Sequence, residues 1–238
     1  YVKNRDLGWQ PARWLAVAVL VGCLVHLFLP GYTAERPRGM TLMYSEVEGE
    51  SSGHLVLDSP GGPPDRDFAE SHDFTDTELN DGRLGKVRRP AREVTALDLP
   101  GVTVSAGDTV AADGGWRRSL RLDLPPDTRF VQLTFPADSG LQKAWVNDIL
   151  ALDSSLERKQ QRKLPILRLV YPPQGPLVVD LLTTNAGAFT AAAVSWHELP
   201  AVLTAPFLGN WPDEARPVFY GPRAEKIQPF EVPAVTSP

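Results

Sequence analysis

The stretch from Arg117 to Leu124 alternates between polar residues and leucines, and this pattern constrains the fold more than any other feature of the chain. Leu120, Leu122 and Leu124 fall on one side of an extended chain, while serine, arginine and aspartate fall on the other. A period of two residues is typical of a β-strand with one face on the core and the other in water. The pattern therefore predicts a sheet that is wet on one face.

The same alternation returns after a turn, Pro125-Pro126-Asp127, at Val131, Leu133 and Phe135. Short apolar runs separated by Pro, Gly and Asp continue along most of the chain. The expected strands are Met40–Val47, His54–Asp58, Val94–Leu97, Val102–Ser105, Arg117–Leu124, Arg129–Phe135, Lys143–Val146, Leu164–Tyr171, Leu177–Leu182 and Phe189–Trp196. Strands spaced this way predict a mainly β fold, an antiparallel β-sandwich or jelly-roll-like domain. The dense apolar pairs Ile166-Leu167, Leu169-Val170 and Val178-Val179 predict strands buried on both faces.

The segment from Trp14 to Leu29 reads WLAVAVLVGCLVHLFL and carries no formal charge. A helix of this length spans roughly 24 Å, slightly less than the ~30 Å hydrocarbon core of a bilayer, and aromatic residues such as Tyr32 suit the interfacial belts. A signal peptide would need a small-residue cleavage site, and a buried helix of a soluble protein would show a polar face. The segment is therefore predicted to span a membrane.

Basic residues flank this segment unevenly, because Lys3, Arg5 and Arg13 precede it and Arg36 and Arg38 follow it. This bias favours a cytoplasmic N-terminus, with the rest of the chain outside the cytoplasm. The expected localisation is thus the cell membrane, with a periplasmic C-terminal domain.

Two later segments lack a clear strand pattern. Residues 59–92, rich in Pro, Gly and charge, are expected to include a long irregular loop, and residues 154–163 a solvated one. The sequence divides into residues 1–31 with the membrane helix, a β-rich segment over 32–100, a sandwich core over 101–198, and a proline-rich extended arm over 199–238.

Composition excludes several classes of function. The single cysteine, Cys23, rules out a disulfide framework and a CxxC metal site within the chain. A net charge of −5 without a basic stripe argues against a nucleic-acid partner. Motifs for nucleophilic or phosphate chemistry, such as GxSxG or a Walker loop, do not occur.

Four histidines are the remaining candidates for site chemistry. His72-Asp73, near Glu70, Asp76 and Glu78, is the cluster that most resembles a metal site. Loops rich in carboxylates are usually only solvated, however. His197, which follows Trp196 at a strand end, is expected to be structural. We therefore expect no catalytic, cofactor-binding or metal-binding residue in this chain.

Tryptophans offer one alternative, a platform for sugars. Trp145 and Trp196 lie in apolar strands and are expected in the core, whereas Trp116 and Trp211 are the expected exposed pair of a binding module.

Three blocks of the chain resemble one family, in order and pattern. They are LFLPGYTAERPRGMTLMYSEVEGE (Leu27 to Glu50), WRRSLRLDLPPDTRFVQLTFPADSGLQKAWVNDI (Trp116 to Ile149) and LPILRLVYPPQGPLVVDLLTTN (Leu164 to Asn185). They resemble the C-terminal region of bacterial membrane-anchored zinc aminopeptidase-like metallopeptidases, relatives of the endoplasmic-reticulum and vacuolar membrane metallopeptidases. The glycine of one family motif is replaced here by Asp148, after Val146-Asn147.

The resemblance implies a non-catalytic β-domain at the end of a zinc metallopeptidase. The family's zinc ligands belong to an N-terminal peptidase domain, and none of those motifs occurs in this sequence. The implied partners are membrane lipid and the peptidase domain of the same protein. The alternative is a membrane-anchored β-sandwich that binds glycans or envelope proteins.

Overall fold

The computed structural model describes residues 15–17, 19–20, 38–59, 64–80, 82, 85–154, 164–173, 175–208, 211–212, 215–217 and 223–235. Most of the predicted membrane segment, Trp14 to Leu29, lies outside this set, as do residues 155–163 of the predicted solvated loop. Residues 15–17 and 19–20 are helical. Within the described residues, no helix has both the length and the apolar character needed to cross a membrane.

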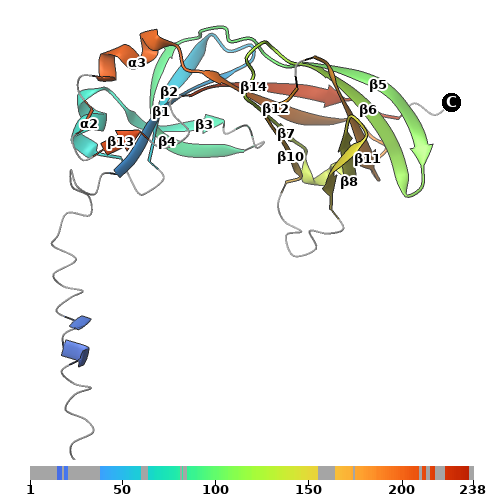
Figure 1. The fold of residues 1–238 in the computed structure, drawn as a ribbon, viewed down its shortest axis with the longest axis horizontal. Helices are drawn as coiled ribbons and strands as arrows, with labels where there is room; N and C mark the ends of the chain where they lie inside the picture. The colour runs from blue at the N-terminus through green and yellow to red at the C-terminus, as the bar shows by residue number, and fades with distance from the viewer. Residues whose placement is uncertain are drawn as a thin grey trace, which may run out of the picture.

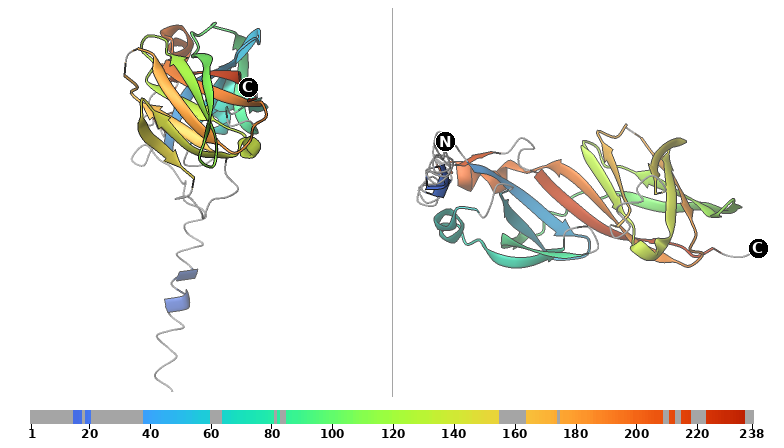
Figure 2. Two further views of the ribbon diagram at one scale, coloured as in Figure 1. Left: turned by 90° about the vertical axis from the view of Figure 1, so that its right-hand side faces the viewer. Right: turned by 90° about the horizontal axis from the view of Figure 1, so that it is seen from below.

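The strands of the described residues form two sheets (Figures 1 and 2). The larger, nine-stranded sheet has the order β10 (Ile166–Val170), β7 (Phe130–Thr134), β12 (Phe189–Glu198), β14 (Arg223–Val232), β1 (Arg38–Val47), β2 (Ser52–Asp58), β4 (Lys86–Thr95) and β3 (Thr75–Asn80), with β13 (Ala215–Pro217) beside β1. The smaller sheet has the order β5 (Thr103–Ala112), β6 (Gly115–Asp123), β11 (Leu177–Thr183), β8 (Leu141–Val146) and β9 (Ile149–Asp153).

One half of the larger sheet packs against the smaller sheet, which makes the sandwich. The alternating leucines of β6, Leu120 and Leu122, meet Leu133 of β7 and Ala193 of β12 in one buried cluster. This is the burial that the period-two pattern predicts, since one face of each strand is taken out of water. The predicted β-sandwich is therefore confirmed.

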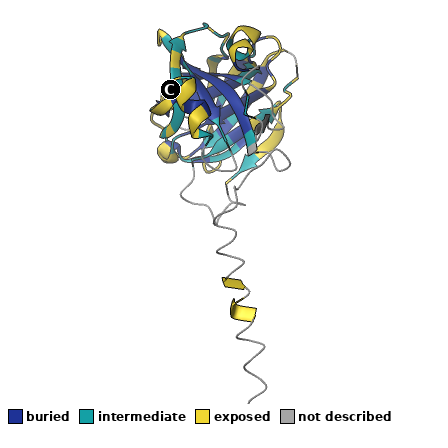
Figure 3. Cartoon of the chain, turned by 90° about the vertical axis from the view of Figure 1, so that its left-hand side faces the viewer, coloured by how far each residue is buried: buried dark blue, intermediate teal, exposed yellow. Residues whose placement is uncertain are grey.

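The other half of the larger sheet is covered by two short helices, α2 (Arg66–Ser71) and α3 (Ala201–Leu208). Phe68 of α2 and Phe207 of α3 pack with Met40 and Leu55 of the sheet in a second buried cluster. Figure 3, which views the molecule from this end, shows buried strands inside and exposed residues around them. The larger sheet therefore runs through both halves and belongs to two cores.

The hairpin β3–β4 curls back over the opposite face of the larger sheet. Leu79 of β3 packs on Met43 and Val56 in a third, smaller cluster. At Gly82 in the turn, with φ +67°, an added Cβ would lie only 2.4 Å from Val194 Cγ2 of β12. Backbone this close to a side chain leaves room only for glycine.

Two predictions are wrong, namely the long irregular loop within residues 59–92 and the extended arm over residues 199–238. Residues 59–92 include α2 and the hairpin β3–β4, because Phe68, Phe74 and Leu79 supply buried side chains. Residues 199–238 include α3 and β14 rather than an extended arm over the sandwich. β14 lies within the larger sheet, where it pairs with β12 on one side and β1 on the other.

Two finer predictions also need correction. The sandwich is not purely antiparallel, because β1 runs parallel to both β13 and β14. Strands with dense apolar pairs are not buried on both faces: Val170 is 64% and Val178 43% exposed. β10 is the last strand of the larger sheet, and β11 alternates between buried and exposed residues.

Candidate functional site

The larger sheet has two faces with different polar chemistry. We call the face that meets the smaller sheet, α2 and α3 the packed face; it carries Tyr44, Glu46 and Ser195. We call the other face, over which the hairpin β3–β4 curls, the open face; it carries Met43 and Val194. Consecutive residues of a strand point to opposite faces, so each strand contributes to both.

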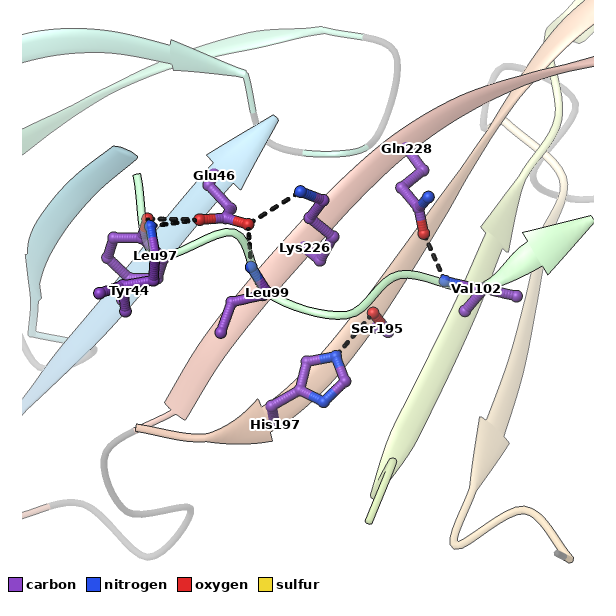
Figure 4. Close-up of polar contacts among 9 residues, drawn as sticks. All are labelled: Tyr44, Glu46, Leu97, Leu99, Val102, Ser195, His197, Lys226 and Gln228. Carbon is purple, nitrogen blue, oxygen red and sulfur yellow. Dashed lines mark hydrogen bonds and ion pairs between the residues drawn. The ribbon is translucent and has the colours of Figure 1, made fainter. Parts of the chain in front are cut away.

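On the packed face, a row of polar side chains, all buried except the half-buried His197, lies against residues 96–102, which connect β4 to β5 (Figure 4). We call this row the polar seam; its members are Tyr44, Glu46, Ser195, His197, Lys226 and Gln228. They come from β1, β12 and β14, where they alternate with the residues of the open face.

Glu46 is the centre of the seam and is only 2% exposed. Its carboxylate accepts hydrogen bonds from Lys226 Nζ at 2.9 Å and from the Tyr44 hydroxyl at 2.5 Å. The backbone amides of Leu97 and Leu99 donate to the same carboxylate at 3.0 and 2.6 Å. These donors replace the hydrogen bonds to water that the Glu46 carboxylate loses when it is buried.

These bonds shift the titration of the pair Glu46 and Tyr44. Burial alone would raise the pKa of Glu46, but the hydrogen bonds from Lys226, Tyr44 and the Leu99 amide together lower it. Burial and the neighbouring carboxylate raise the pKa of Tyr44. Glu46 is therefore held ionised and Tyr44 neutral, which suits a structural anchor.

The seam continues toward the sandwich. The Val102 amide donates to the side-chain oxygen of Gln228. The Ser195 hydroxyl lies 3.0 Å from His197 Nε2, and the Pro100 carbonyl also bonds His197. Burial lowers the pKa of His197, against the opposing effects of Pro100 and Glu46.

A serine hydroxyl beside an imidazole is also the geometry of a nucleophile and its base. Ser195 is 0% exposed, however, and lies beneath the connection formed by residues 96–102. The hydroxyl has no route to a substrate in this arrangement.

A second buried charge, Arg118, holds the far end of the sandwich. It is 1% exposed and donates to the backbone carbonyls of Gly187, Pro233 and Asn185, with the first two at 3.1 and 2.7 Å. Its guanidinium also lies 5.3 Å from the Phe189 ring. Burial lowers the pKa of Arg118, and the three carbonyls satisfy most of its donors.

The open face holds a hollow of about 200 Å³ between the hairpin β3–β4 and strands β1, β7, β12 and β14. Its aromatic wall is Trp196 stacked on Phe130, with ring centroids 4.0 Å apart. The Arg223 guanidinium lies 4.3 Å from the centre of the Trp196 ring. Aromatic faces with a fixed cation are recognition chemistry, as in ligand sites with few placed polar groups.

Glu225 lies beside this cation and is 9% exposed. Its carboxylate accepts a hydrogen bond from Arg223 Nε at 3.0 Å. Burial raises the pKa of Glu225, while the charges of Arg223 and Arg89 act in the opposite direction. The hollow thus combines a stacked guanidinium, that of Arg223, with the carboxyl group of Glu225, whose ionised form is disfavoured by burial.

The residues around His72, the cluster that most resembles a metal site in the sequence, are dispersed in the structure. His72 packs between the rings of Phe68 and Phe207, at 4.4 and 5.2 Å, and its Nδ1 is bonded to the Phe68 carbonyl oxygen at 2.9 Å. Glu70 pairs with Arg66, and Glu78 with Lys86. Among the described residues there is no group of three or more His, Cys, Asp or Glu side chains that could hold a metal ion.

Three of the four candidate tryptophans, Trp145, Trp196 and Trp211, are placed differently from the prediction. Trp211 packs edge-on against Phe68 at 5.4 Å, and its indole nitrogen is buried, so it is not part of an exposed row. Trp116 belongs to β6 in the smaller sheet. Trp145 and Trp196 are not in the core: each is half-buried and faces an arginine, Arg117 and Arg223 respectively.

Sequence reasoning missed Glu46, Lys226, Arg223 and Glu225. A signal for Glu46 existed, because it continues the inward series Met40, Leu42 and Tyr44 at every second position. A charged residue at an inward position must have a partner. The partner was not identifiable, because the proline-containing segment RAEKIQPFEV was not predicted as a strand.

No family model matches the chain, and no curated protein matches it. Among solved structures, the mu homology domain of Fcho1 from Danio rerio, with a bound Eps15 peptide, is similar at 11% sequence identity. The match covers 82% of this chain and 96% of that chain, with a TM-score of 0.29. A likeness this distant carries no argument about function.

Proposed function

We propose that this chain is a non-catalytic, extracytoplasmic β-domain tethered to the membrane by residues 14–29. It forms the C-terminal part of a zinc-dependent metallopeptidase, in which a separate peptidase domain binds the zinc and hydrolyses peptides. The observation that supports this proposal is the place of β1, because the strand that follows the apolar segment lies inside the larger sheet.

A tether is effective when it is attached to a rigid element. β1 is hydrogen-bonded to β2 on one side and to β13 and β14 on the other, and Glu46 ties it to Lys226. Residues 30–37 separate it from the apolar segment. A short linker to a rigid strand holds the domain at a high effective concentration beside anything anchored to the same membrane.

The buried charges support an accessory role in a second way. Glu46 and Lys226 fix the connection between the two halves, and Arg118 fixes the end of the sandwich. Such groups stabilise one arrangement of the sheets. A domain that positions a catalytic partner needs this rigidity, because misplacement of a reacting group by about 1 Å is costly.

Immunoprecipitation from native membranes tests the proposal. An antibody to this domain is expected to recover, only after detergent extraction, a polypeptide much larger than 26.1 kDa that carries zinc and aminopeptidase activity. Protease added to sealed inverted vesicles is expected to leave the domain intact. Recovery of a 26.1 kDa protein without zinc, or from the soluble fraction, would contradict the proposal.

The chain by itself provides the complementary experiment. Purified in detergent, it is expected to hold no stoichiometric zinc and to hydrolyse no aminoacyl substrate. Zinc at one equivalent, with activity lost in His72→Ala and Asp73→Ala variants, would make this chain an enzyme and would overturn its accessory role.

The alternative is a membrane-anchored binding module for glycans or envelope proteins. The stacked pair Trp196 and Phe130 on the open face favours it, in place of Trp116 and Trp211. Screening the chain against neutral glycans and envelope proteins separates the two candidates. Binding of one of these ligands, by a native protein that contains no peptidase domain, would favour the binding module.

A further inference from the structure

Arg223 is held in one orientation within the hollow. Its Nε donates to Glu225 at 3.0 Å, and the guanidinium carbon lies 4.3 Å from the centre of the Trp196 ring. The hydrogen bonds found among the described residues leave its two terminal nitrogens unused. A planar guanidinium fixed by stacking and by one bond presents its remaining donors in a geometry that matches a carboxylate.

The neighbouring acidic groups are already paired. Asp58 accepts from Arg89 at 3.0 Å, and Glu225 accepts from Arg223 Nε. Arg168 on β10 adds a further positive charge near the open face, where its Nε donates to Gln132 at 3.1 Å. The charge of the hollow therefore favours an anionic ligand.

An apolar row leads from this cation to the edge of the sheet. In the register of the strands, Glu225 lies opposite Trp196, Trp196 opposite Phe130, and Phe130 opposite Val170. Val170 is 64% exposed, on the last strand of the larger sheet. Strands lie about 4.8 Å apart, so the row is about 14 Å long, the span of about four extended residues.

We propose that the hollow binds a carboxylate of an extended peptide on Arg223, with apolar residues of the same peptide lying along Trp196, Phe130 and Val170. The carboxylate is an acidic side chain or a C-terminus. A hollow of about 200 Å³ suits one side chain, since it is smaller than the sites of drug-sized ligands. This proposal does not depend on the zinc peptidase assignment, and it is tested on this chain alone.

Calorimetric titration of the full chain in detergent is the test. The probes are Ac-Asp-Leu-Val-Phe-NH₂, its Asn counterpart Ac-Asn-Leu-Val-Phe-NH₂, and Ac-Phe-Val-Leu with a free C-terminus. The Asp peptide is expected to bind about tenfold more tightly than the Asn peptide, because a charge-assisted bidentate contact is lost. Binding of the third probe, in place of the first, would identify a C-terminal carboxylate as the ligand.

Three single-residue variants test where on the chain the peptide binds. Arg223→Gln is expected to remove the preference for Asp over Asn. Val170→Glu, at an exposed position that does not endanger folding, is expected to weaken binding of the Asp peptide at least fivefold, because an apolar side chain of the peptide would meet a carboxylate in place of valine. Arg121→Gln is the matched control, because Arg121 is an exposed arginine of the smaller sheet paired with Asp123, and it is expected to change nothing.

Several results would overturn the proposal. They are equal affinity for the Asp and Asn peptides when the third probe does not bind either, unchanged binding in Val170→Glu, or no binding of any of the three peptides. Binding of glucuronate without binding of the peptides would also overturn it, in favour of a sugar acid.

Discussion

Lys226 Nζ donates to Glu46 Oε1 at 2.9 Å across the parallel pair of strands β1 and β14, and the two side chains are 9% and 1% exposed. The same carboxylate accepts from the Leu97 and Leu99 amides. One enclosed ion pair therefore joins β1, its neighbour β14, and the connection to the smaller sheet.

Replacing Glu46 by Leu is expected to lower the free energy of unfolding by about 3–5 kcal/mol, because Lys226 would remain buried without its counter-charge. Lys226→Met is expected to have a similar effect. The double variant is expected to lose less than the sum of the two, since the partners interact directly. Urea unfolding of the chain in detergent, followed by tryptophan fluorescence, measures this.

The control for this series is Lys86→Met. Lys86 pairs with Glu78 on the surface, where both side chains are at least half exposed. Exposed pairs contribute little, so its unfolding curve should overlay that of the wild type. Additive effects at Glu46 and Lys226 would contradict the coupling of the seam.

Lowering the pH below neutrality is expected to weaken the fold through His197. The folded state lowers the pKa of His197 below its ordinary value of 6.5, so the unfolded chain takes up the proton first. The free energy of unfolding should therefore decrease as the pH falls from about 8 through 6.5. In His197→Gln this part of the pH dependence should disappear. Parallel profiles of unfolding free energy against pH for the wild type and the variant would refute the role of His197.

Glu225 is expected to act in the opposite direction. The folded state raises its pKa, so the carboxyl group stabilises the fold fully below its ordinary value of 4.5 and less as the pH rises. The difference in stability between the wild type and Glu225→Gln should therefore favour the wild type more at pH 5 than at pH 8. Thermal unfolding at both values measures it, and an equal difference at the two would exclude the shift.

Gly53→Ala tests the fit between β1 and β2. A Cβ at Gly53 would lie 2.2 Å from the hydroxyl oxygen of Tyr44, which is 0% exposed and bonded to Glu46. Overpacking of this kind costs about 1–3 kcal/mol. Gly107→Ala is the matched control in an exposed strand, where the nearest neighbour lies 3.3 Å away. Equal unfolding midpoints for the two variants would show that Tyr44 moves freely.

The sequence identified the sandwich where burial repeats at every second residue. Leu120 and Leu122 in β6 and Leu133 in β7 are buried as the alternation requires. It overestimated burial at Val170, because a dense apolar run does not reveal that its strand is the last of a sheet.

The sequence could not reveal β14. Its buried residues include Lys226 and Gln228, whose polarity is compensated by partners far away in the sequence. Glu46 and the Val102 amide are two of these partners. Such pairings depend on the tertiary fold, so the local pattern predicts a proline-rich extended arm in place of a strand. The candidate binding hollow was missed for the same reason, since Arg223 and Glu225 belong to this strand.

The position of β14 also determines the order in which the molecule can be completed during synthesis. The ribosome makes β1 and β12 before residues 223–232, which pair with both of them. Until residues 223–232 are synthesised, one edge of β1 and one edge of β12 remain unpaired, and unpaired strand edges readily pair with other chains. The larger sheet is therefore completed only when β14 has been synthesised. A premature stop before Arg223 would release an aggregation-prone product.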